Sequence, residues 1–349
     1  MVDDEKLRAG LGGFPDARGA RIDSESDQPD VVAFAGDLQS VVGYVVERVQ
    51  VEDSIKPFRY LGKFHRKVLY HKGRDPPPVR HCHVSAIIPA MKDTREEWYD
   101  ESAKVAVTIV DVTSAAQALA RGHLSGPASA YFLSKALAAA ALLGGETSEK
   151  DEVVSIQMKC KGPLGGFNVE CSADGALRGY TERKTLDEFD GLGKPDVKKI
   201  VGERRIQVTR SVPGRIISQG ISTSLDGYLA GSLQRKACIY LDATVTDEVE
   251  VLGARGVMVE ALPDSSAHVT DYVPEKLFIA SRSILKGLGL ERAVLRKSSP
   301  LRFECRCSPE RAAAMLGALS EDERKNLPPT IDITCHMCGR TFTVPGSCA

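Results

Sequence analysis

The sequence predicts an α+β fold, with a mixed-sheet core domain carrying helices, a helical linker and a small C-terminal four-cysteine zinc domain. Two observations support this prediction. Short apolar segments with the period of two typical of strands are interrupted by helical segments in no regular alternation, which argues against a doubly wound sheet. A C-x-C motif and a C-x-x-C motif then fall close together in the last 45 residues of the chain.

The first hundred residues resist assignment. Residues 1 to about 30 are rich in Gly, Asp and Arg with few large apolar side chains, so we expect disorder there. A basic stretch from Arg59 to Arg74 follows, and three consecutive prolines at 76–78 end any regular element. Residues 1–103 are therefore predicted to be an N-terminal extension, partly disordered and without an assigned role.

The core domain is predicted to span residues 104–263. Thr113 is expected to cap a short helix over 114–121, and Pro127 to open a nearly all-apolar helix that ends near 143. A helix that is apolar nearly all round is buried on several sides. Strands are expected over 105–112, 154–160, 167–171, 205–209, 216–221, 237–241 and 256–262, with a helix over 225–234.

Residues 264–300 are predicted to form a metastable helical linker. Apolar residues between 274 and 295 recur with helical spacing, but Gly287 and Gly289 interrupt them. Each glycine weakens a helix by up to about 1 kcal/mol relative to alanine. A helix that is weak by itself must be held by its neighbours. The segment is either an ordinary connector between domains or a segment that detaches when its neighbours no longer hold it in place.

Four of the nine cysteines form the two motifs at the C-terminus. Each motif presents two thiolates from one short turn, and four thiolates suit the closed tetrahedral site of structural zinc. The predicted metal ligands are Cys305, Cys307, Cys335 and Cys338. Two dithiols with redox chemistry alone, or a chance clustering of cysteines, are the alternatives that the spacing leaves open.

The expected order in the zinc domain, residues 301–349, is strand, helix, strand, knuckle, strand. Ser308 followed by Pro309 is typical of a helix start, and this helix should run to about Leu319, with a second short one at 321–327. Gly339 follows the last cysteine of the pattern directly, where a tight knuckle needs a residue free to take positive φ.

Composition excludes several classes of function. The net charge of −1 and the aromatic content of 6% give no argument for attraction to nucleic acids or membranes. No signal-peptide pattern opens the chain, and cysteine usage suits a reducing compartment, so a cytoplasmic protein is expected. No Ser/His/Asp or Cys/His set and no phosphate-binding loop stands out. We therefore expect no enzyme activity, no catalytic residues and no organic cofactor.

With these pieces in order, the chain from about Lys104 to Val344 resembles the heat-shock protein 33 family, redox-regulated chaperones that hold zinc. The motifs that carry the resemblance are the hairpin loop at 162–166, the triplet at 178–180, the triplet at 219–221, the segment at 228–234, the stretch at 256–263 and the four-cysteine pattern. The resemblance covers about two-thirds of the sequence. Cys348 is an extra thiol outside the pattern.

The resemblance implies an ATP-independent holdase that is switched by oxidation. In the reduced state the four cysteines would hold one Zn²⁺ per chain, favoured by the nearby positive charges of Arg302, Arg306 and Arg340. When oxidised, the same cysteines would form the disulfides Cys305–Cys307 and Cys335–Cys338, by analogy with the family. Zinc would leave, the zinc domain and linker would unfold, and the protein would bind unfolding clients as a homodimer.

Two other functions remain as alternatives. A zinc-ribbon protein that binds nucleic acid is compatible with the cysteine pattern and with the basic stretch at 59–74. A thiol–disulfide oxidoreductase would use Cys335 and Cys338, but a redox dithiol of that kind opens a helix after a strand, whereas Gly339 and a short strand follow here.

Overall fold

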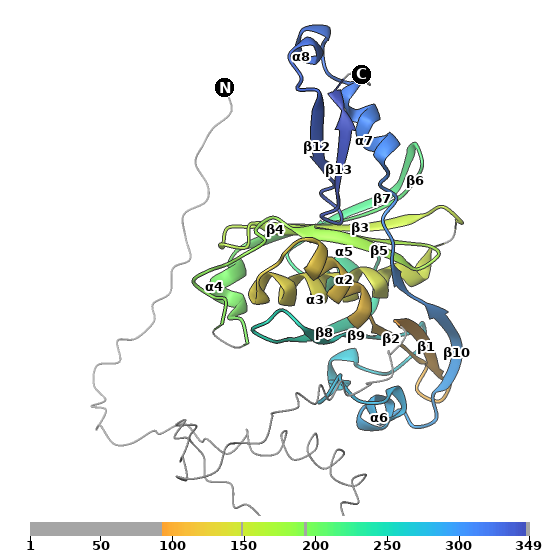
Figure 1. Ribbon diagram of the computed structural model, residues 1–349. Coiled ribbons are helices and arrows are strands. Elements are labelled where there is room, and N and C mark those ends of the chain that lie inside the picture. The colour runs from red at the N-terminus through yellow and green to blue at the C-terminus, as the bar shows by residue number, and fades with distance from the viewer. Residues whose placement is uncertain (1–92, 148, 192–193, 347–349) are drawn as a thin grey trace, which may run out of the picture. The chain divides into compact units, whose positions relative to one another are not determined.

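A computed structural model of the chain describes residues 93–147, 149–191 and 194–346. Most of the predicted N-terminal extension, together with Cys82 and Cys348, lies outside these residues. The described residues belong to one compact unit. Their arrangement confirms the α+β class (Figure 1).

The helices and strands of the core follow one another without a repeating order. The first half contains β1 (Thr94–Asp100), β2 (Val105–Asp111), α2 (Thr113–Gly122), α3 (Pro127–Leu143), the short 3₁₀ helix η1 (Gly144–Glu146), β3 (Val153–Cys160), β4 (Gly166–Ser172) and β5 (Ala176–Thr181). The second half contains α4 (Val197–Val201), β6 (Arg204–Val212), β7 (Arg215–Ser222), α5 (Leu225–Ser232), β8 (Lys236–Val245) and β9 (Val251–Ala261).

Two sheets form the core. Sheet A has the order β10-β1-β2-β9-β8, where β10 (Val294–Pro300) comes from the predicted linker, and all its pairings are antiparallel. Sheet B has the order β11-β5-β4-β3-β6-β7, where β11 (Arg302–Phe303) runs parallel to β5. That one parallel pairing makes sheet B mixed, and the predicted hairpin at 154–171 is the β3–β4 pair.

Helix α3 lies between the two sheets, which explains its composition (Figure 1). Fifteen of its 17 residues are buried, and they form one core cluster with the inner faces of both sheets. Among the described residues, Pro127–Glu146 is the one helical stretch long and apolar enough to cross a membrane, but 89% of it is buried inside the fold. The apolar surface of α3 is therefore used for packing, as the sequence predicted.

The outer face of sheet A is covered by the linker. The 3₁₀ turn η2 (Val269–Asp271) and helix α6 (Ser281–Gly287) precede β10. The side chains of Ile284, Leu285, Leu288 and Leu290 pack on Trp98 and on alternate residues of β2 and β9. The predicted helical linker is helical only over seven residues, because its C-terminal part pairs with β1 as an edge strand.

Strand β1 lies inside the segment expected to be the N-terminal extension. It pairs with β2 and β10, so ordered structure begins before Lys104, where the sequence placed it. Most of its residues are charged or polar, so the sequence shows no apolar alternation there that would predict a strand. Arg95 is only 2% exposed and is accommodated because its Nη1 donates to the carbonyl oxygen of Ala141 in α3 at 2.9 Å.

The C-terminal module, residues 301–346, has the predicted order of elements. It contains β11, α7 (Pro309–Leu316), α8 (Glu321–Lys325), β12 (Thr330–Thr334) and β13 (Thr341–Pro345). Ser308 accepts a hydrogen bond from the Arg311 backbone N–H and caps α7, as predicted. The β12–β13 hairpin stands on the outer side of sheet B, with its knuckle towards the core (Figure 1).

Candidate metal centre

Two short loops bring the four predicted cysteines together. Cys305 and Cys307 follow β11, while Cys335 and Cys338 lie in the knuckle between β12 and β13. The knuckle is closed by hydrogen bonds from the N–H groups of Cys338 and Gly339 to the Cys335 carbonyl oxygen, at 3.4 and 2.9 Å. Gly339 takes φ +74°, the conformation predicted for it.

The four sulfur atoms have the spacing of a tetrahedral site. Cys305 and Cys335 Sγ are 3.8 Å apart, Cys307 and Cys338 Sγ are 3.4 Å apart, and all four lie within 4.8 Å of one another. Tetrahedral ligands at the Zn–S distance of about 2.3 Å would be about 3.8 Å apart. The separations of 3.4 and 3.8 Å lie at or just below this value and none exceeds 4.8 Å, so the geometry and the all-sulfur donor set both fit zinc.

The protein alone does not favour four thiolates. Burial raises the pKa of the Cys338 thiol, which is 3% exposed, and burial also raises the pKa of Cys307. For Cys305 burial opposes ionisation, but hydrogen bonds from Cys307, Cys338 and Arg178 outweigh it and lower the pKa. A bound dication would oppose the raised pKa of Cys307 and of Cys338, because its positive charge stabilises thiolates.

A positive charge contacts the cluster from Arg178, a residue that the sequence analysis did not expect there. Arg178 in β5 directs Nη1 to Cys305 Sγ at 4.0 Å, while its Nε donates to Glu170 at 2.7 Å. Arg306, which was expected to act on the thiolates, has Nη2 3.7 Å from Glu170. Arg302 pairs with Asp174 and Glu304 instead. The triplet at 178–180 was recognised as a motif, but its contact with the cysteines was not foreseen.

The cluster is docked on the core through backbone atoms. The N–H of Gly179 in β5 donates to the Met337 carbonyl oxygen at 3.0 Å. The end of α2 meets the knuckle so closely that a Cβ on Gly122 would lie 2.6 Å from the Cys338 carbonyl oxygen. Only a residue without a side chain fits there. The metal site is therefore linked both to sheet B and to the C-terminal end of α2.

Two aromatic side chains complete this contact. The rings of Tyr180 and His336 meet edge to face, with centroids 5.6 Å apart. His123, 8% exposed, has Nε2 2.9 Å from the Gly179 carbonyl oxygen. Because a carbonyl only accepts, Nε2 carries the proton and donates this hydrogen bond. The pKa of His123 is lowered, chiefly by burial, and the lowered pKa keeps the ring neutral beside the knuckle.

The remaining cysteines take no part in the cluster. Cys171 is buried and Cys160 half-buried, and both are free thiols. Cys238 in β8 is also free and half-buried. Among the described residues, the four C-terminal cysteines are the one group whose side chains could hold a metal ion.

Comparison with known proteins places this architecture in a family. A family model described as "Hsp33 protein" matches residues 93–345. A 33 kDa chaperonin of Thermus thermophilus is 28% identical over 270 residues, covering 68% of this chain and 79% of the relative. A 33 kDa chaperonin of Synechocystis is 27% identical over 268 residues, covering 68% and 87%.

The fold is also shared with a solved structure. A crystal structure of the 33 kDa chaperonin (heat shock protein 33 homolog) of Thermotoga maritima superposes with a TM-score of 0.66 at 18% identity, covering 73% of this chain and 96% of that one. The family model, which matches residues 93–345, takes in both sheets and the C-terminal cysteines. The chain therefore belongs to the Hsp33 family of chaperones.

Proposed function

We propose that this chain is a redox-regulated, ATP-independent holdase, whose four C-terminal cysteines hold one Zn²⁺ in the reduced state. The observation that supports this most directly is the tetrahedral spacing of four sulfurs in a module with little core of its own. Its own apolar cluster contains three fully buried side chains, Ala312, Leu316 and Val344, with partly buried residues packed against them. A bound metal would thus supply most of the module's folding free energy, on the order of 10–16 kcal/mol in zinc-finger peptides.

Oxidation of the cysteines would remove the stabilisation that the bound metal supplies. Two thiolates give two electrons to one peroxide molecule and form one S–S bond, while the peroxide takes two protons from solvent and leaves as two water molecules. Two such steps consume all four ligands. We propose the pairs Cys305–Cys307 and Cys335–Cys338, which close short loops and therefore cannot replace the metal as a link between the two halves of the module.

The linker would connect metal loss to client binding. Unfolding of the module removes β11 from sheet B, directly after β10 and α6. Helix α6 has only seven residues and is followed by Gly289 with φ +72°. Its departure would uncover the apolar side chains on the outer face of sheet A, among them Trp98, Val107 and Val257. An exposed apolar patch of this kind is a surface for unfolding proteins.

In domain terms, we propose that residues 104–263 form the chaperone core, that residues 264–300 form a linker that releases, and that residues 301–349 form the redox switch. Strand β1 extends the core to residue 93. The partners would be unfolded client proteins and, when oxidised, a second copy of the chain. We place the protein in the cytoplasm and assign it no enzyme activity.

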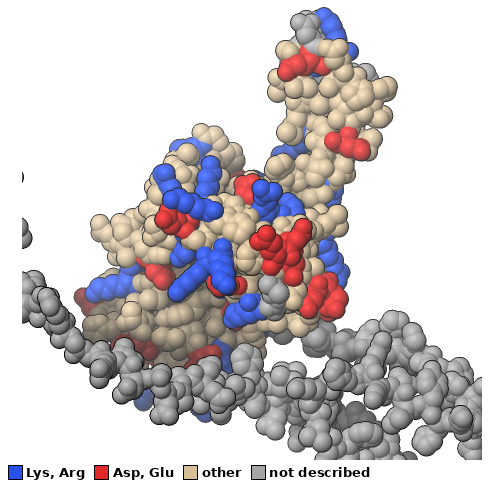
Figure 2. Space-filling model, turned by 90° about the vertical axis from the view of Figure 1, so that its left-hand side faces the viewer, with Lys and Arg blue, Asp and Glu red and all other residues tan. Residues whose placement is uncertain are grey.

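The two alternatives find less support. Figure 2 shows basic and acidic side chains interspersed on one face of the molecule, not a continuous basic surface. Lysines near α4 are paired, with Lys161 2.5 Å from Glu203 and Lys194 3.4 Å from Asp242. Cys335 and Cys338 lie between two strands rather than at a helix start, which is unlike a thiol–disulfide oxidoreductase.

The test combines zinc release with client binding. A chromogenic chelator measures metal released by peroxide at mildly raised temperature, while light scattering follows an aggregating client in the same samples. We expect one zinc per chain to be released by oxidation and only the oxidised protein to suppress scattering. Cys238→Ser and Cys160→Ser, outside the cluster, should behave as the unchanged protein does. Zinc retention after oxidation, or equal suppression by the reduced protein, would refute the switch.

A further inference from the structure

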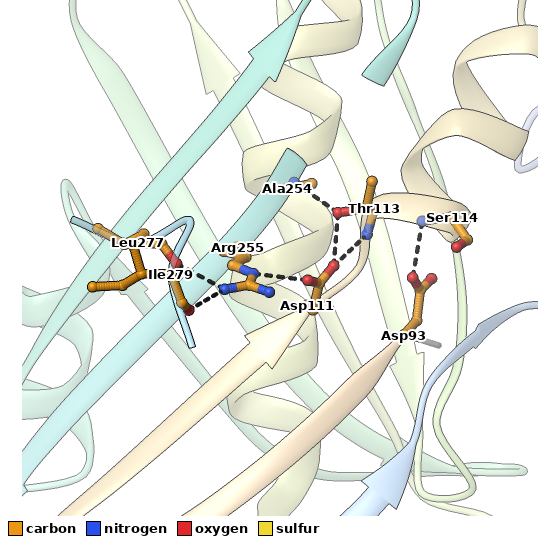
Figure 3. A network of polar contacts seen from close by, with 8 residues as sticks. All are labelled: Asp93, Asp111, Thr113, Ser114, Ala254, Arg255, Leu277 and Ile279. Atoms are coloured by element: carbon orange, nitrogen blue, oxygen red, sulfur yellow. Dashed lines mark hydrogen bonds and ion pairs between the residues drawn. The ribbon is translucent and has the colours of Figure 1, made fainter. Parts of the chain in front are cut away.

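The linker is tied to the core by a charged side chain as well as by apolar packing. Arg255 in β9 directs Nη1 to the carbonyl oxygens of Leu277 and Ile279, at 3.0 and 2.6 Å (Figure 3). Its Nε donates to Asp111 Oδ2 at 2.7 Å. The side chains of Arg255 and Asp111 are 13% and 8% exposed, so little water reaches this ion pair.

The two carbonyls belong to the part of the linker with the least regular structure. Residues 272–280, between η2 and α6, form neither helix nor strand. Phe278, which lies between the two carbonyls, packs on Gly253 of β9, where an added Cβ would come within 2.6 Å of its ring. The linker thus crosses β9 with its backbone oxygens on Arg255 and its aromatic ring on Gly253. This crossing fixes the point from which α6 starts.

Asp111 is held in place from the N-terminal end of α2. Its Oδ1 accepts hydrogen bonds from the N–H and hydroxyl of Thr113, at 3.1 and 2.6 Å, and Thr113 Oγ1 accepts from the Ala254 N–H at 3.0 Å (Figure 3). The carboxylate is therefore positioned before it meets Arg255. A guanidinium suits this place, because its planar fork can serve a carboxylate and two carbonyls at once.

Helix α2 joins this contact to the metal centre. Its N-terminal end fixes Asp111 through Thr113, and the carboxylate of Asp93 accepts from the N–H groups of Ser114 and Ala115, at 2.8 and 2.7 Å. Its C-terminal end, at Gly122, is where the cysteine knuckle docks. One ten-residue helix thus touches both the knuckle and the anchor of the linker.

We propose that Arg255 is a positioning residue for the linker, and that the Asp111–Arg255 pair with its two linker carbonyls is a polar latch that must open before sheet A is uncovered. This inference rests on the proposed function. None of the latch groups belongs to the cysteine cluster, so the latch can be removed by substitution without changing a cysteine. Opening it in reduced, metal-loaded protein would release the linker without oxidation.

The experiment uses the full-length, reduced protein with Arg255→Ala and Arg255→Lys. We expect zinc content to stay at one per chain in both variants. Hydrogen exchange at the N–H groups of Ile284, Leu288 and Leu290, which are hydrogen-bonded within the linker, should rise at least about tenfold in Arg255→Ala. That factor corresponds to about 1.4 kcal/mol. Arg255→Lys keeps the charge but not the fork, so it should fall between Arg255→Ala and the unchanged protein.

A matched control separates the latch from a general loss of stability. Arg210→Ala removes an ion pair of similar burial, with Glu152 at 2.6 Å, in sheet B and away from the linker. It should lower stability without raising exchange in the linker. Reduced Arg255→Ala should suppress client aggregation, whereas reduced Arg210→Ala should not.

The outcomes distinguish the latch from the proposed function. Unchanged linker exchange in Arg255→Ala would overturn the latch, whatever the clients do. Raised exchange without client binding would overturn it as a gate, provided that the oxidised unchanged protein binds clients. If the oxidised unchanged protein binds none either, the proposed function fails, while raised exchange still supports the latch as the group that positions the linker.

Discussion

The layer around α3 and the C-terminal module are held together in opposite ways. Helix α3 is buried by two sheets, and the cluster around it contains large side chains with no exposed surface, such as Leu133, Leu137 and Ile156. The separate apolar cluster of the C-terminal module contains three buried side chains, and the module brings four sulfurs together. Apolar burial therefore stabilises the core in any redox state, whereas under the proposed function the module would depend on metal–sulfur bonds that an oxidant can remove.

Under the proposed function, this difference would let the module unfold while the core stays folded. Loss of the module costs the core one short parallel strand, β11, and the backbone contacts at Gly122 and Gly179. Two buried side chains of the module, Leu301 and Cys338, belong to the cluster around α3, and Phe303 and the other three cysteines of the pattern pack against its edge. The predictions below test whether the two regions are separable.

The largest expected effect is that of metal removal. A strong chelator under reducing conditions should unfold residues 301–346, because zinc contributes on the order of 10–16 kcal/mol to small zinc domains. Amide exchange should become fast at Cys335 and Phe342 and stay slow at Ile156 and Val208. Unfolding of both regions together would show that they are not separable.

A substitution in the core should destabilise the core and leave the metal bound to the module. Leu137→Ala in α3 removes a fully buried side chain and should lower the free energy of unfolding of the core by about 2–5 kcal/mol. The measurement is denaturant unfolding of the reduced protein, with zinc content read in parallel. Zinc should remain bound at temperatures where the core is still folded. Metal loss from the folded variant would contradict the separation.

A smaller effect is expected where the two regions touch. Gly122→Ala places a Cβ 2.6 Å from the Cys338 carbonyl oxygen and should weaken docking of the knuckle. Exchange at the Gly179 N–H, which bonds to Met337, should rise several-fold while zinc stays bound. Gly231→Ala in α5 is the matched control, since a Cβ there meets nothing within 4 Å. Equal exchange in both variants would show that the contact at Gly122 is unimportant.

The smallest effect is confined to the module. Ser308→Ala removes the cap of α7 and should cost about 1 kcal/mol, the usual value for loss of a capping serine. Less chelator should then be needed to withdraw half of the zinc, with no change in the thermal unfolding of the core. A change in the core transition would mean that α7 supports more than its own module.

Much of this organisation was predictable from local sequence. The apolar composition of α3, the alternation in β3 and β4, the cap at Ser308 and the positive φ of Gly339 are local properties of the chain, and the structure confirms each. The four cysteines were found from spacing alone, because two close pairs are what a tetrahedral site requires.

What was missed depends on contacts between distant parts of the chain. Thr113 was expected to cap α2 but is the first residue of the helix. The side chain that accepts hydrogen bonds from the helix start is Asp93, which lies 21 residues before Ser114. Strands β1 and β10 were not predicted, because their residues are largely charged or polar. Arg178 contacts Cys305 only through the pairing of β11 with β5, which no sequence period reveals.

Strand β10 is attached to β1 by backbone hydrogen bonds, and all but one of its seven side chains are exposed. If β10 leaves with the rest of the linker, β1 becomes the edge of sheet A, with a row of unpaired N–H and C=O groups. Such an edge accepts any extended peptide in register, because the pairing uses atoms that every residue carries. The protein could then bind clients of many different sequences, because the pairing would use backbone atoms alone.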